Sequence, residues 1–343
     1  MSKRIAMFNH KGGVSKTTSV YNIGWMLAKS AKVLIVDADP QCNLSALVLG
    51  DSFEPYYIDQ NTKLQNIKDG VKVAFEGKPF PISAVNCYSP QRAPSLFLLA
   101  GHANLSEYDA ALTFAQTSNN AIATLQNLPG AFSELLKLTE DKYSIDYTII
   151  DMNPSLSAIN QNLFISAHAF IVPTNPDPFS VMAIATLTSI LPRWNGWVRS
   201  AAPLFSGSAY PLPDFSPKFI GSLIQRFNIR KGKAARPYRD NIAEIKTSIA
   251  GPFLQSLSKA GMVLPTASYP QGFVDTNYCL GEIPDFQGLL PKAYDAGVPV
   301  FELTDSEINE TGPVLTQMKE KRKLFFDQFQ TIATTVLTIL QNV

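Results

Sequence analysis

Two lysines, two glycines and two threonines stand close together near the start of the chain. Residues 9–18 read Asn-His-Lys-Gly-Gly-Val-Ser-Lys-Thr-Thr, directly after the apolar run from Ile5 to Phe8 and before a helical pattern. In such a loop, consecutive backbone N–H groups and the N-terminus of the following helix form a concave anion site. Lys16 would reach the β- and γ-phosphates of a nucleotide, and the Thr17 hydroxyl would ligate Mg²⁺. The segment therefore predicts a phosphate-binding loop.

Two residues of this loop depart from the ordinary pattern G-x-x-x-x-G-K-[ST], and a third has no role in it. His10 and Ser15 occupy the two glycine positions, and Lys11 has no role in the ordinary scheme. The second departure matters more, because glycine before the lysine lets the backbone approach phosphate without a Cβ atom. We expect Ser15 to fit with a negative φ.

Aspartates follow two further apolar segments. Residues 32–41 read KVLIVDADPQ, and residues 146–156 read DYTIIDMNPSL. Continuous apolar runs predict strands that are buried on both faces of a parallel sheet, and open α/β sheets bind ligands at the carboxyl ends of such strands. The second strand ends in Asp151, which is the Walker B arrangement for holding Mg²⁺ directly or through water. Asp39 alone could also be a turn or helix-cap residue, because Asp-Pro is a turn signal.

These segments, in this order, resemble the ParA/MinD family of deviant Walker A ATPases, and in particular its ParA-like partitioning branch. The loop matches the family's KGGxxK[ST], residues 37–41 match D-x-D-P-Q, and residues 146–156 match D-Y-x-x-I-D-x-P-P-S-L except at Asn153. Residues 96–105, 169–180 and 293–300 also resemble family segments. The resemblance covers essentially the whole chain.

The resemblance implies a doubly wound α/β fold, with a mostly parallel sheet flanked by helices. It implies that Lys11 reaches across a homodimer to the partner's nucleotide, that Lys16 and Lys11 neutralise phosphoryl charge, and that Asp39 positions the attacking water. The implied cofactors are ATP and Mg²⁺. The implied nucleotide-binding residues are Lys11, Gly12, Gly13, Val14, Ser15, Lys16, Thr17, Thr18 and Asn228, and the implied metal site is formed by Thr17, Asp39 and Asp151.

The length and composition set the domain organisation that we expect. With 343 residues and 45% hydrophobic content, the chain can bury a sizeable core. We expect a single domain over 1–343 with loop insertions at 51–92, 191–217 and 262–284; the proline density of 191–217 argues against regular structure there. The three cysteines are isolated and fit a reducing cytosol. The early first strand leaves no room for a signal peptide.

Basic residues gather between Lys218 and Lys246. Eight Lys or Arg stand there against two acidic residues, a local charge of +6 in a chain of formal charge +1, which leaves about −5 for the rest. Clustered basic residues neutralise phosphates and give salt-sensitive, sequence-independent DNA binding. Alternatively, residues 226–230 serve the nucleotide, or the cluster is a solvated face. The candidate DNA-binding residues are Arg226, Arg230, Lys231, Lys233, Arg236 and Arg239.

The stretch 312–343 predicts a helix that opens at Gly-Pro and carries basic residues 319–323 before an apolar face. MinD-type relatives end in a basic amphipathic helix that lies on membrane. Here the basic residues precede the apolar face instead of lining it, so we expect the helix to pack on the core, as in the ParA branch.

Together these observations predict a cytoplasmic or nucleoid-associated ATPase switch that dimerises with ATP, hydrolyses it slowly, and is stimulated by a ParB-like or other adaptor. Its role would be partitioning or positioning of a cargo on DNA. The alternatives are an ATP-dependent dimeric scaffold with weak hydrolysis and a MinD-like membrane-associated ATPase. A nitrogenase-iron-protein type of reductase is rejected, since the three cysteines cannot supply a bridging cluster.

Overall fold

The computed structural model describes residues 2–118, 122, 125–230 and 233–343. Its centre is a sheet of seven parallel strands in the order β3-β2-β4-β1-β5-β6-β9. The strands of this sheet are β1 (Lys3–Met7), β2 (Val33–Ala38), β3 (Leu96–Leu99), β4 (Tyr147–Met152), β5 (Ala169–Thr174), β6 (Lys218–Gln225) and β9 (Cys279–Ile283). Two short antiparallel strands of two residues each, β7 (Ile229–Arg230) and β8 (Lys233–Ala234), form a separate β7–β8 hairpin.

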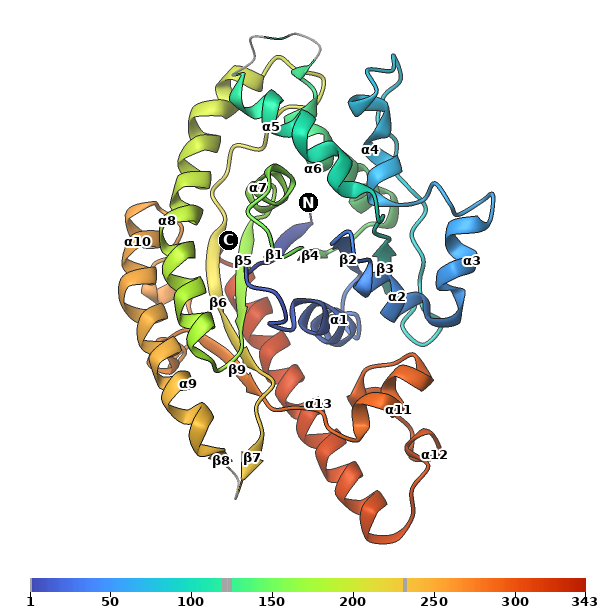
Figure 1. The fold of residues 1–343 in the computed structure, drawn as a ribbon, viewed down its shortest axis with the longest axis vertical. Coiled ribbons are helices and arrows are strands. Elements are labelled where there is room, and N and C mark those ends of the chain that lie inside the picture. Colours follow the sequence, from blue (N-terminus) through green and yellow to red (C-terminus); the bar gives the residue numbers. More distant parts are fainter. Residues whose placement is uncertain (1, 119–121, 123–124, 231–232) are drawn as a thin grey trace.

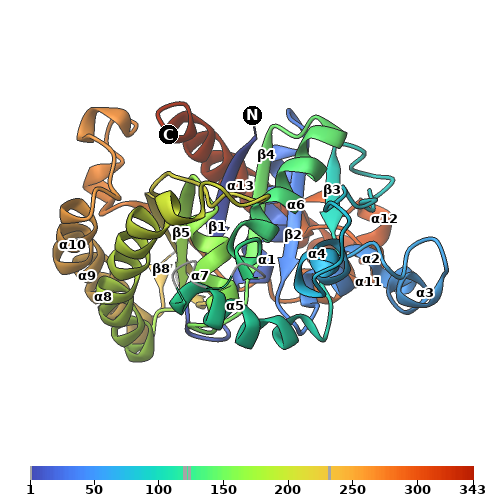
Figure 2. The same cartoon turned by 90° about the horizontal axis from the view of Figure 1, so that it is seen from above.

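Helices cover both faces of the sheet (Figure 1). In that view α1 and α13 lie below the sheet and contact each other, whereas α6 and α7 lie above it. Figure 2 shows α8, α9 and α10 gathered beyond the β5 side, with α2, α3 and α4 at the β3 side. The helices are α1 (Lys16–Leu27), α2 (Asn43–Leu49), α3 (Phe53–Ile58), α4 (Ile67–Phe75), α5 (Asp109–Thr117), α6 (Leu128–Tyr143), α7 (Ala158–Ile165), α8 (Pro178–Ala201), α9 (Arg236–Ser248), α10 (Leu254–Lys259), α11 (Leu289–Ala296), α12 (Asp305–Ile308) and α13 (Gly312–Leu340).

The strands form where the sequence has continuous apolar runs. Every residue of β2 and β5 is buried, as expected for strands covered by helices on both faces. Parallel neighbours need a crossover connection, and the helices between successive strands supply it. The doubly wound α/β fold is confirmed.

One expectation about the chain between β5 and β6 is wrong. Residues 191–201 are not irregular, because α8 continues to Ala201 with Pro192 inside it. A proline within a helix leaves the carbonyl four residues earlier without its N–H donor. Here that carbonyl, of Thr188, accepts a hydrogen bond of 2.7 Å from the Ser256 hydroxyl of α10. The neighbouring helix thus supplies the donor that proline lacks.

The other two ranges expected to be insertions also contain regular elements. The range 51–92 holds α3 and α4, and the range 262–284 ends in β9, which pairs with β6 at the edge of the main sheet. Residues 279–283 of that range are therefore part of the core fold. One connected cluster of buried side chains extends from Ile5 to Leu340. The single domain over 1–343 and the insertion status of the three ranges remain predictions.

The last helix, α13, packs its apolar face on the core. Phe325, Phe329 and Ile332 are at most 2% exposed, and the helix contacts α1 and β9. Its basic residues bond to neighbouring groups: the Lys319 ammonium, for example, lies 2.8 Å from a carboxylate oxygen of Asp305. In the described residues, helices that are both long and apolar enough to span a bilayer are absent. The packing expected for this helix is confirmed.

Candidate nucleotide-binding site

The loop between β1 and α1 has the shape of an anion-binding loop. Gly13 and Ser15 both adopt left-handed conformations, with φ of 71° and 61°. These turns lead the chain into α1, which begins at Lys16. The expectation of a negative φ at Ser15 is wrong. A left-handed conformation brings the Cβ of an L-residue close to the following carbonyl oxygen, so the serine introduces strain where the ordinary motif has glycine.

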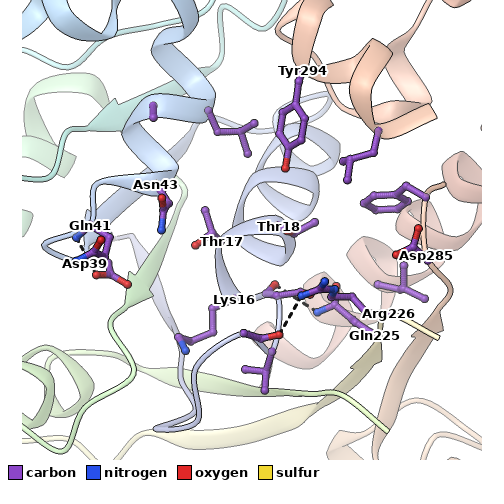
Figure 3. A pocket seen from close by; sticks show the side chains of 18 of the residues that line it. Lys16, Thr17, Thr18, Asp39, Gln41, Asn43, Gln225, Arg226, Asp285 and Tyr294 are labelled. Atoms are coloured by element: carbon purple, nitrogen blue, oxygen red, sulfur yellow. Dashed lines mark hydrogen bonds between the residues drawn. The ribbon is translucent and has the colours of Figure 1, made fainter. Parts of the chain in front are cut away.

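A cleft of about 810 Å³ opens above this loop (Figure 3). That volume is in the range of sites that enclose a small molecule. One wall is the loop and the start of α1, a second follows β2, and a third comes from the ends of β6 and β9 and from α11. The cleft is lined by Gly13, Val14, Ser15, Lys16, Thr17, Thr18, Asp39, Gln41, Asn43, Ala46, Leu47, Gly50, Pro154, Gln225, Arg226, Ile283, Pro284, Asp285, Phe286, Leu290 and Tyr294.

Lys16 is the principal cation of the cleft floor. Its ammonium donates to the backbone carbonyls of Asn9 and Lys11, at 3.0 and 3.1 Å. Burial lowers the pKa of Lys16, while the negative charges of Asp151 and Asp39 oppose that shift. Because backbone carbonyls are weaker partners than anionic oxygens, the ammonium is available to a phosphate group.

Asp151, one residue before the end of β4, has a carboxylate without a well-formed hydrogen bond. The residue is 1% exposed, and neither carboxylate oxygen makes a hydrogen bond of good geometry with the described residues; the Thr17 hydroxyl approaches it closely enough for a weak one. Burial raises the pKa of Asp151 well above its usual range, and the neighbouring Asp37 raises it further, whereas Thr17 and Lys16 act in the opposite direction. A buried carboxylate without partners is unfavourable, and a nearby cation would relieve it.

Asp37 and Asp39 play different structural parts. Asp37 lies opposite Asp151 in the β2–β4 register and is fully buried; it accepts hydrogen bonds from the backbone N–H and the hydroxyl of Ser45, at 2.8 and 2.7 Å. Burial raises the pKa of Asp37 to about 6 despite these bonds. Its other oxygen accepts from the Asp39 N–H at 3.2 Å, which fixes the turn that presents Asp39 to the cleft. The structure therefore places Asp39 beside the loop, as the resemblance implies.

These residues fit a magnesium ion bound together with a nucleotide. No group of three or more His, Cys, Asp or Glu side chains within the described part of the chain forms a ready-made metal cage. Mg²⁺ is usually held by one or two carboxylates, water and substrate phosphates, so a cage is not required. The buried carboxylate of Asp151, only weakly bonded to the Thr17 hydroxyl at the start of α1, suits this mode of binding.

The far wall of the cleft comes from segments more than 200 residues away. Arg226 follows β6 with a φ of 61°, and its guanidinium approaches the Gly13 carbonyl at 3.5 Å. Asp285 and Tyr294 complete the wall; in Figure 3 the tyrosine ring extends from α11 toward the loop. Asn228, which the resemblance implies as a nucleotide ligand, is exposed and is not among the described residues that line the cleft. The side chains at this end of β6 that line the cleft are Gln225 and Arg226.

The sequence reasoning missed Asp285, Phe286 and Tyr294. Proline before Asp285 was a turn signal, and the position of Tyr294 next to the matched segment 293–300 was a further clue. Neither indicated that α11 closes the cleft, because that contact depends on how the C-terminal third packs against α1.

Lys11 does not face the cleft. Its ammonium lies 2.5 Å from a carboxylate oxygen of Asp177 and 3.1 Å from the hydroxyl of Ser180, both at the start of α8. Among the described residues, neither Lys11 nor Gly12 belongs to the lining of the cleft. The two loop lysines therefore point to different places: Lys16 to the floor of its own site, and Lys11 to the edge of the molecule at α8.

The candidate DNA-binding residues are divided between two places. Arg226 belongs to the cleft, whereas Arg236 and Arg239 are exposed on the first turns of α9. Arg230 and Lys233 belong to the β7–β8 hairpin just before this helix, and Lys231 lies outside the described residues. Two other basic residues of the stretch are engaged: Lys218 with the Gly261 carbonyl and Lys246 with Glu282.

Comparisons with known proteins place this site in a family. A family model described as an AAA domain matches residues 2–196. The uncharacterized protein Rv1708 of Mycobacterium tuberculosis is 32% identical over 193 residues, which are 56% of this chain and 52% of that protein. The chromosome partitioning protein ParA of Caulobacter vibrioides is 27% identical over 194 residues, 56% of this chain and 63% of that protein. The matches thus span only about half to two thirds of these relatives.

Solved structures share the fold. Apo McdA of Cyanothece aligns with a TM-score of 0.57 and 20% identity, covering 95% of this chain and 99% of that chain. The pNOB8 ParA bound to nonspecific DNA aligns with a TM-score of 0.56 and 17% identity, covering 100% and 99%. At such identities the likeness is one of fold alone.

The strain at Ser15 leads to a stability prediction. Ser15→Gly should raise the free energy of unfolding by about 0.5–1 kcal/mol, because glycine adopts the left-handed conformation without a Cβ clash. The matched change in the other direction is Gly13→Ala, which places a Cβ on a left-handed residue and should lower the free energy of unfolding by about 1–2 kcal/mol. Urea unfolding of both variants measures the effect; an unchanged or lower stability of Ser15→Gly would contradict the strain.

The different roles of Lys16 and Thr17 can be separated by the metal. Lys16→Ala should weaken ATP binding roughly tenfold to hundredfold with or without Mg²⁺, since a charge-assisted contact to phosphate is lost. Thr17→Ala should weaken ATP binding in Mg²⁺ but leave ATP binding in EDTA unchanged. Calorimetric titration with ATP in Mg²⁺ and in EDTA tests this, and wild-type affinity of both variants in Mg²⁺ would refute the assignment of the site.

Proposed function

Since the chain belongs to the AAA-domain family matched above and is a ParA-like ATPase, we propose that it is an ATP-dependent dimerising switch that positions a cargo on DNA. The observation that carries this proposal is the direction of Lys11. A second loop lysine that does not face its own cleft can serve a phosphate only if that phosphate belongs to another molecule. Two-fold symmetry then makes the contact reciprocal, with each protomer completing its partner's site.

In this proposal the residues around the cleft have different roles in binding and hydrolysing ATP. Lys16 binds the β- and γ-phosphates of ATP, and the partner's equivalent of Lys11 adds a second positive charge where negative charge develops. Thr17, Asp39 and Asp151 would hold Mg²⁺, which neutralises phosphate charge. Asp39 orients the attacking water. Because the chain contributes positioning and charge but no covalent step, turnover is slow until an activating partner improves the geometry.

The far wall would hold the base. Arg226, Asp285 and Tyr294 offer a cation, a hydrogen-bond acceptor and an aromatic ring on one side of the cleft. Such a combination suits a purine stacked against apolar side chains with its edge read by polar groups. The cleft is long enough to include both this wall and the phosphate loop.

The exposed arginines of α9 support the proposal that the dimer binds DNA. The Asn241 amide of this helix donates to the carbonyl of Pro176 at 3.1 Å, so the start of α9 adjoins the connection that leads to Asp177 and α8. Arg236 and Arg239 therefore lie close to the edge where Lys11 is found. Dimerisation at that edge would bring the two sets of arginines together and so couple DNA binding to ATP.

Two other functions compete with this proposal. A scaffold with feeble turnover uses the same cleft and differs only in rate, which the first prediction below measures. Membrane association through α13 would require its apolar face to be free, but Phe329 and its neighbours on that face are buried in the core.

The role of Asp39 provides the direct test of the switch. Asp39→Ala should still bind ATP and dimerise, but its turnover should fall by about a hundredfold or more, because water positioning is lost while the phosphate contacts remain. Sedimentation with ATP should show a dimer that persists. Asp327→Ala, which removes an exposed carboxylate of α13 away from the cleft, is the control and should leave the decay of the dimer at the wild-type rate. Normal turnover of Asp39→Ala would exclude Asp39 from catalysis and favour the scaffold.

DNA binding should depend on α9 and on salt. The double change Arg236→Ala and Arg239→Ala should weaken binding to random-sequence duplex DNA in the presence of ATP, and should reduce the slope of log K against log salt by about 2 per protomer. Lys137→Ala, an exposed lysine on α6, is the control and should leave the slope unchanged. Fluorescence anisotropy at several salt concentrations measures both, and an unaltered slope in the double variant would remove α9 from the DNA surface.

A further inference from the structure

The Lys11 side chain is held by its own chain. Besides the contact with the Asp177 carboxylate, its ammonium contacts the Ser180 hydroxyl, and the side chains of the ion pair are only 20% and 33% exposed. The ammonium of Lys11 has three N–H groups, and two acceptors at the start of α8 bind it. The pair is more shielded from solvent than most surface ion pairs of this chain, such as Lys323 with Asp327 at 75% and 52% exposure.

Asp177 is itself fixed in place. It is the N-cap of α8, where its second carboxylate oxygen accepts from the Ser180 N–H at 2.8 Å. One oxygen therefore caps the helix while the other binds Lys11. Since the cap fixes the rotamer, the carboxylate offers the lysine a preorganised partner that loses little entropy on binding.

The surrounding chain ties the two segments together. Asn175, two residues before Asp177, donates to the Gly13 carbonyl at 2.8 Å, and Asn9 donates to the Pro173 carbonyl at the same distance. Two side-chain-to-backbone hydrogen bonds thus join the phosphate loop to β5 and to the β5–α8 connection. Lys11 can leave Asp177 by rotation of its own side chain, without breaking these backbone contacts.

We propose that Asp177 is an intramolecular latch that competes with the partner's nucleotide for Lys11 and so disfavours dimers. The proposal rests on the function proposed above, in which Lys11 binds phosphate across the dimer. A carboxylate and a phosphate are alternative anions for the same ammonium, so the dimer forms only after each protomer has given up its own ion pair. The latch keeps the free protein monomeric until ATP offers the stronger anion.

Binding of a nucleotide in the cleft would also affect how Lys11 is held. The Lys11 carbonyl accepts from the Lys16 ammonium, and ATP in the cleft would draw that ammonium away toward phosphate. Residue 11 then loses one of the contacts that hold its backbone. Binding of ATP to one protomer thereby loosens the residue that this protomer must extend toward its partner.

The size of the effect follows from the number of latches. Releasing one half-shielded ion pair shifts the monomer–dimer equilibrium by roughly threefold to tenfold. Two pairs are released per dimer, so removing the latch should lower the dimer dissociation constant by about tenfold to hundredfold, or about 1.4–2.8 kcal/mol.

The test uses Asp177→Asn in the full-length chain. Asparagine keeps an oxygen for the α8 cap and removes the charge that holds Lys11. Asp327→Asn is the matched control, because it neutralises another carboxylate paired with a lysine, far from the cleft on α13. Sedimentation in a non-hydrolysable ATP analogue should give a dimer dissociation constant tenfold to hundredfold lower for Asp177→Asn, and an unchanged value for Asp327→Asn.

A second readout requires no nucleotide. In the free monomer, the rate at which acetic anhydride acylates Lys11 reports whether its ammonium is engaged, with Lys137 on α6 as an internal reference. Asp177→Asn should raise the ratio of the two rates at least severalfold. Unchanged or weaker dimerisation of Asp177→Asn, or an unchanged labelling ratio, would overturn the latch.

Failure of the latch and failure of the proposed function give different results. If Asp177→Asn behaves as wild type but Lys11→Ala fails to dimerise, Lys11 acts across the dimer and the latch alone is wrong. If Lys11→Ala dimerises as well as wild type, the proposed role of Lys11 is wrong, and the latch is overturned with it.

Discussion

A buried carboxylate without a full hydrogen bond is the constraint on which the rest of the site depends. Asp151 lies one residue before the end of β4 in the middle of the sheet, where it is 1% exposed and where Asp37 adds a second acid in the adjacent strand. Such an arrangement is unfavourable unless a cation is close. Among the described residues, the cation that opposes this charge is Lys16, whose own ammonium is buried and bonded to backbone carbonyls. In the proposed function, a metal ion that arrives with phosphate would relieve the remaining negative charge.

The fold places the groups that surround Asp151 in fixed positions and so forms a defined site. The parallel register aligns the ends of β1, β2 and β4, so that the loop and both acidic strand ends meet at one edge of the sheet. Ser45 fixes Asp37 and thereby the turn that presents Asp39. The β5–α8 connection holds the loop from the other side, and α11 closes the cleft over it. Ligand binding at this edge is a general property of open parallel sheets.

The sequence carried enough information for the strands and the floor of the site, because each is local. Continuous apolar runs followed by Asp39 and Asp151 identified buried strands and their functional ends, and the loop pattern located Lys16 and Thr17. The left-handed φ of Ser15 was not predictable from residue type, since serine disfavours it and only the surrounding loop imposes it. The helix through Pro192 depended on a hydroxyl from α10, a partner far away in the sequence.

Long-range packing also explains what was missed around the cleft. The strand β9 is short and contains Gly281, so its apolar pattern is too weak to mark it as part of the sheet. The choice of Arg226 over Asn228 depends on which side chain after β6 turns inward, and the pairing of Lys11 with Asp177 joins residues 166 positions apart. Motif matching assigns Lys11 a role in the dimer but gives no information about its partner in the monomer.

The action of Lys11 across the dimer is tested most directly by mixing two inactive variants. Lys11→Ala retains a nucleotide site but lacks the reaching lysine, and Lys16→Ala lacks the site but retains Lys11. If Lys11 acts on the partner's nucleotide, an equimolar mixture should hydrolyse ATP measurably faster than the sum of the two variants alone, because one complete site forms per mixed dimer. Wild-type turnover by Lys11→Ala alone, or a mixture no faster than that sum, would contradict the account.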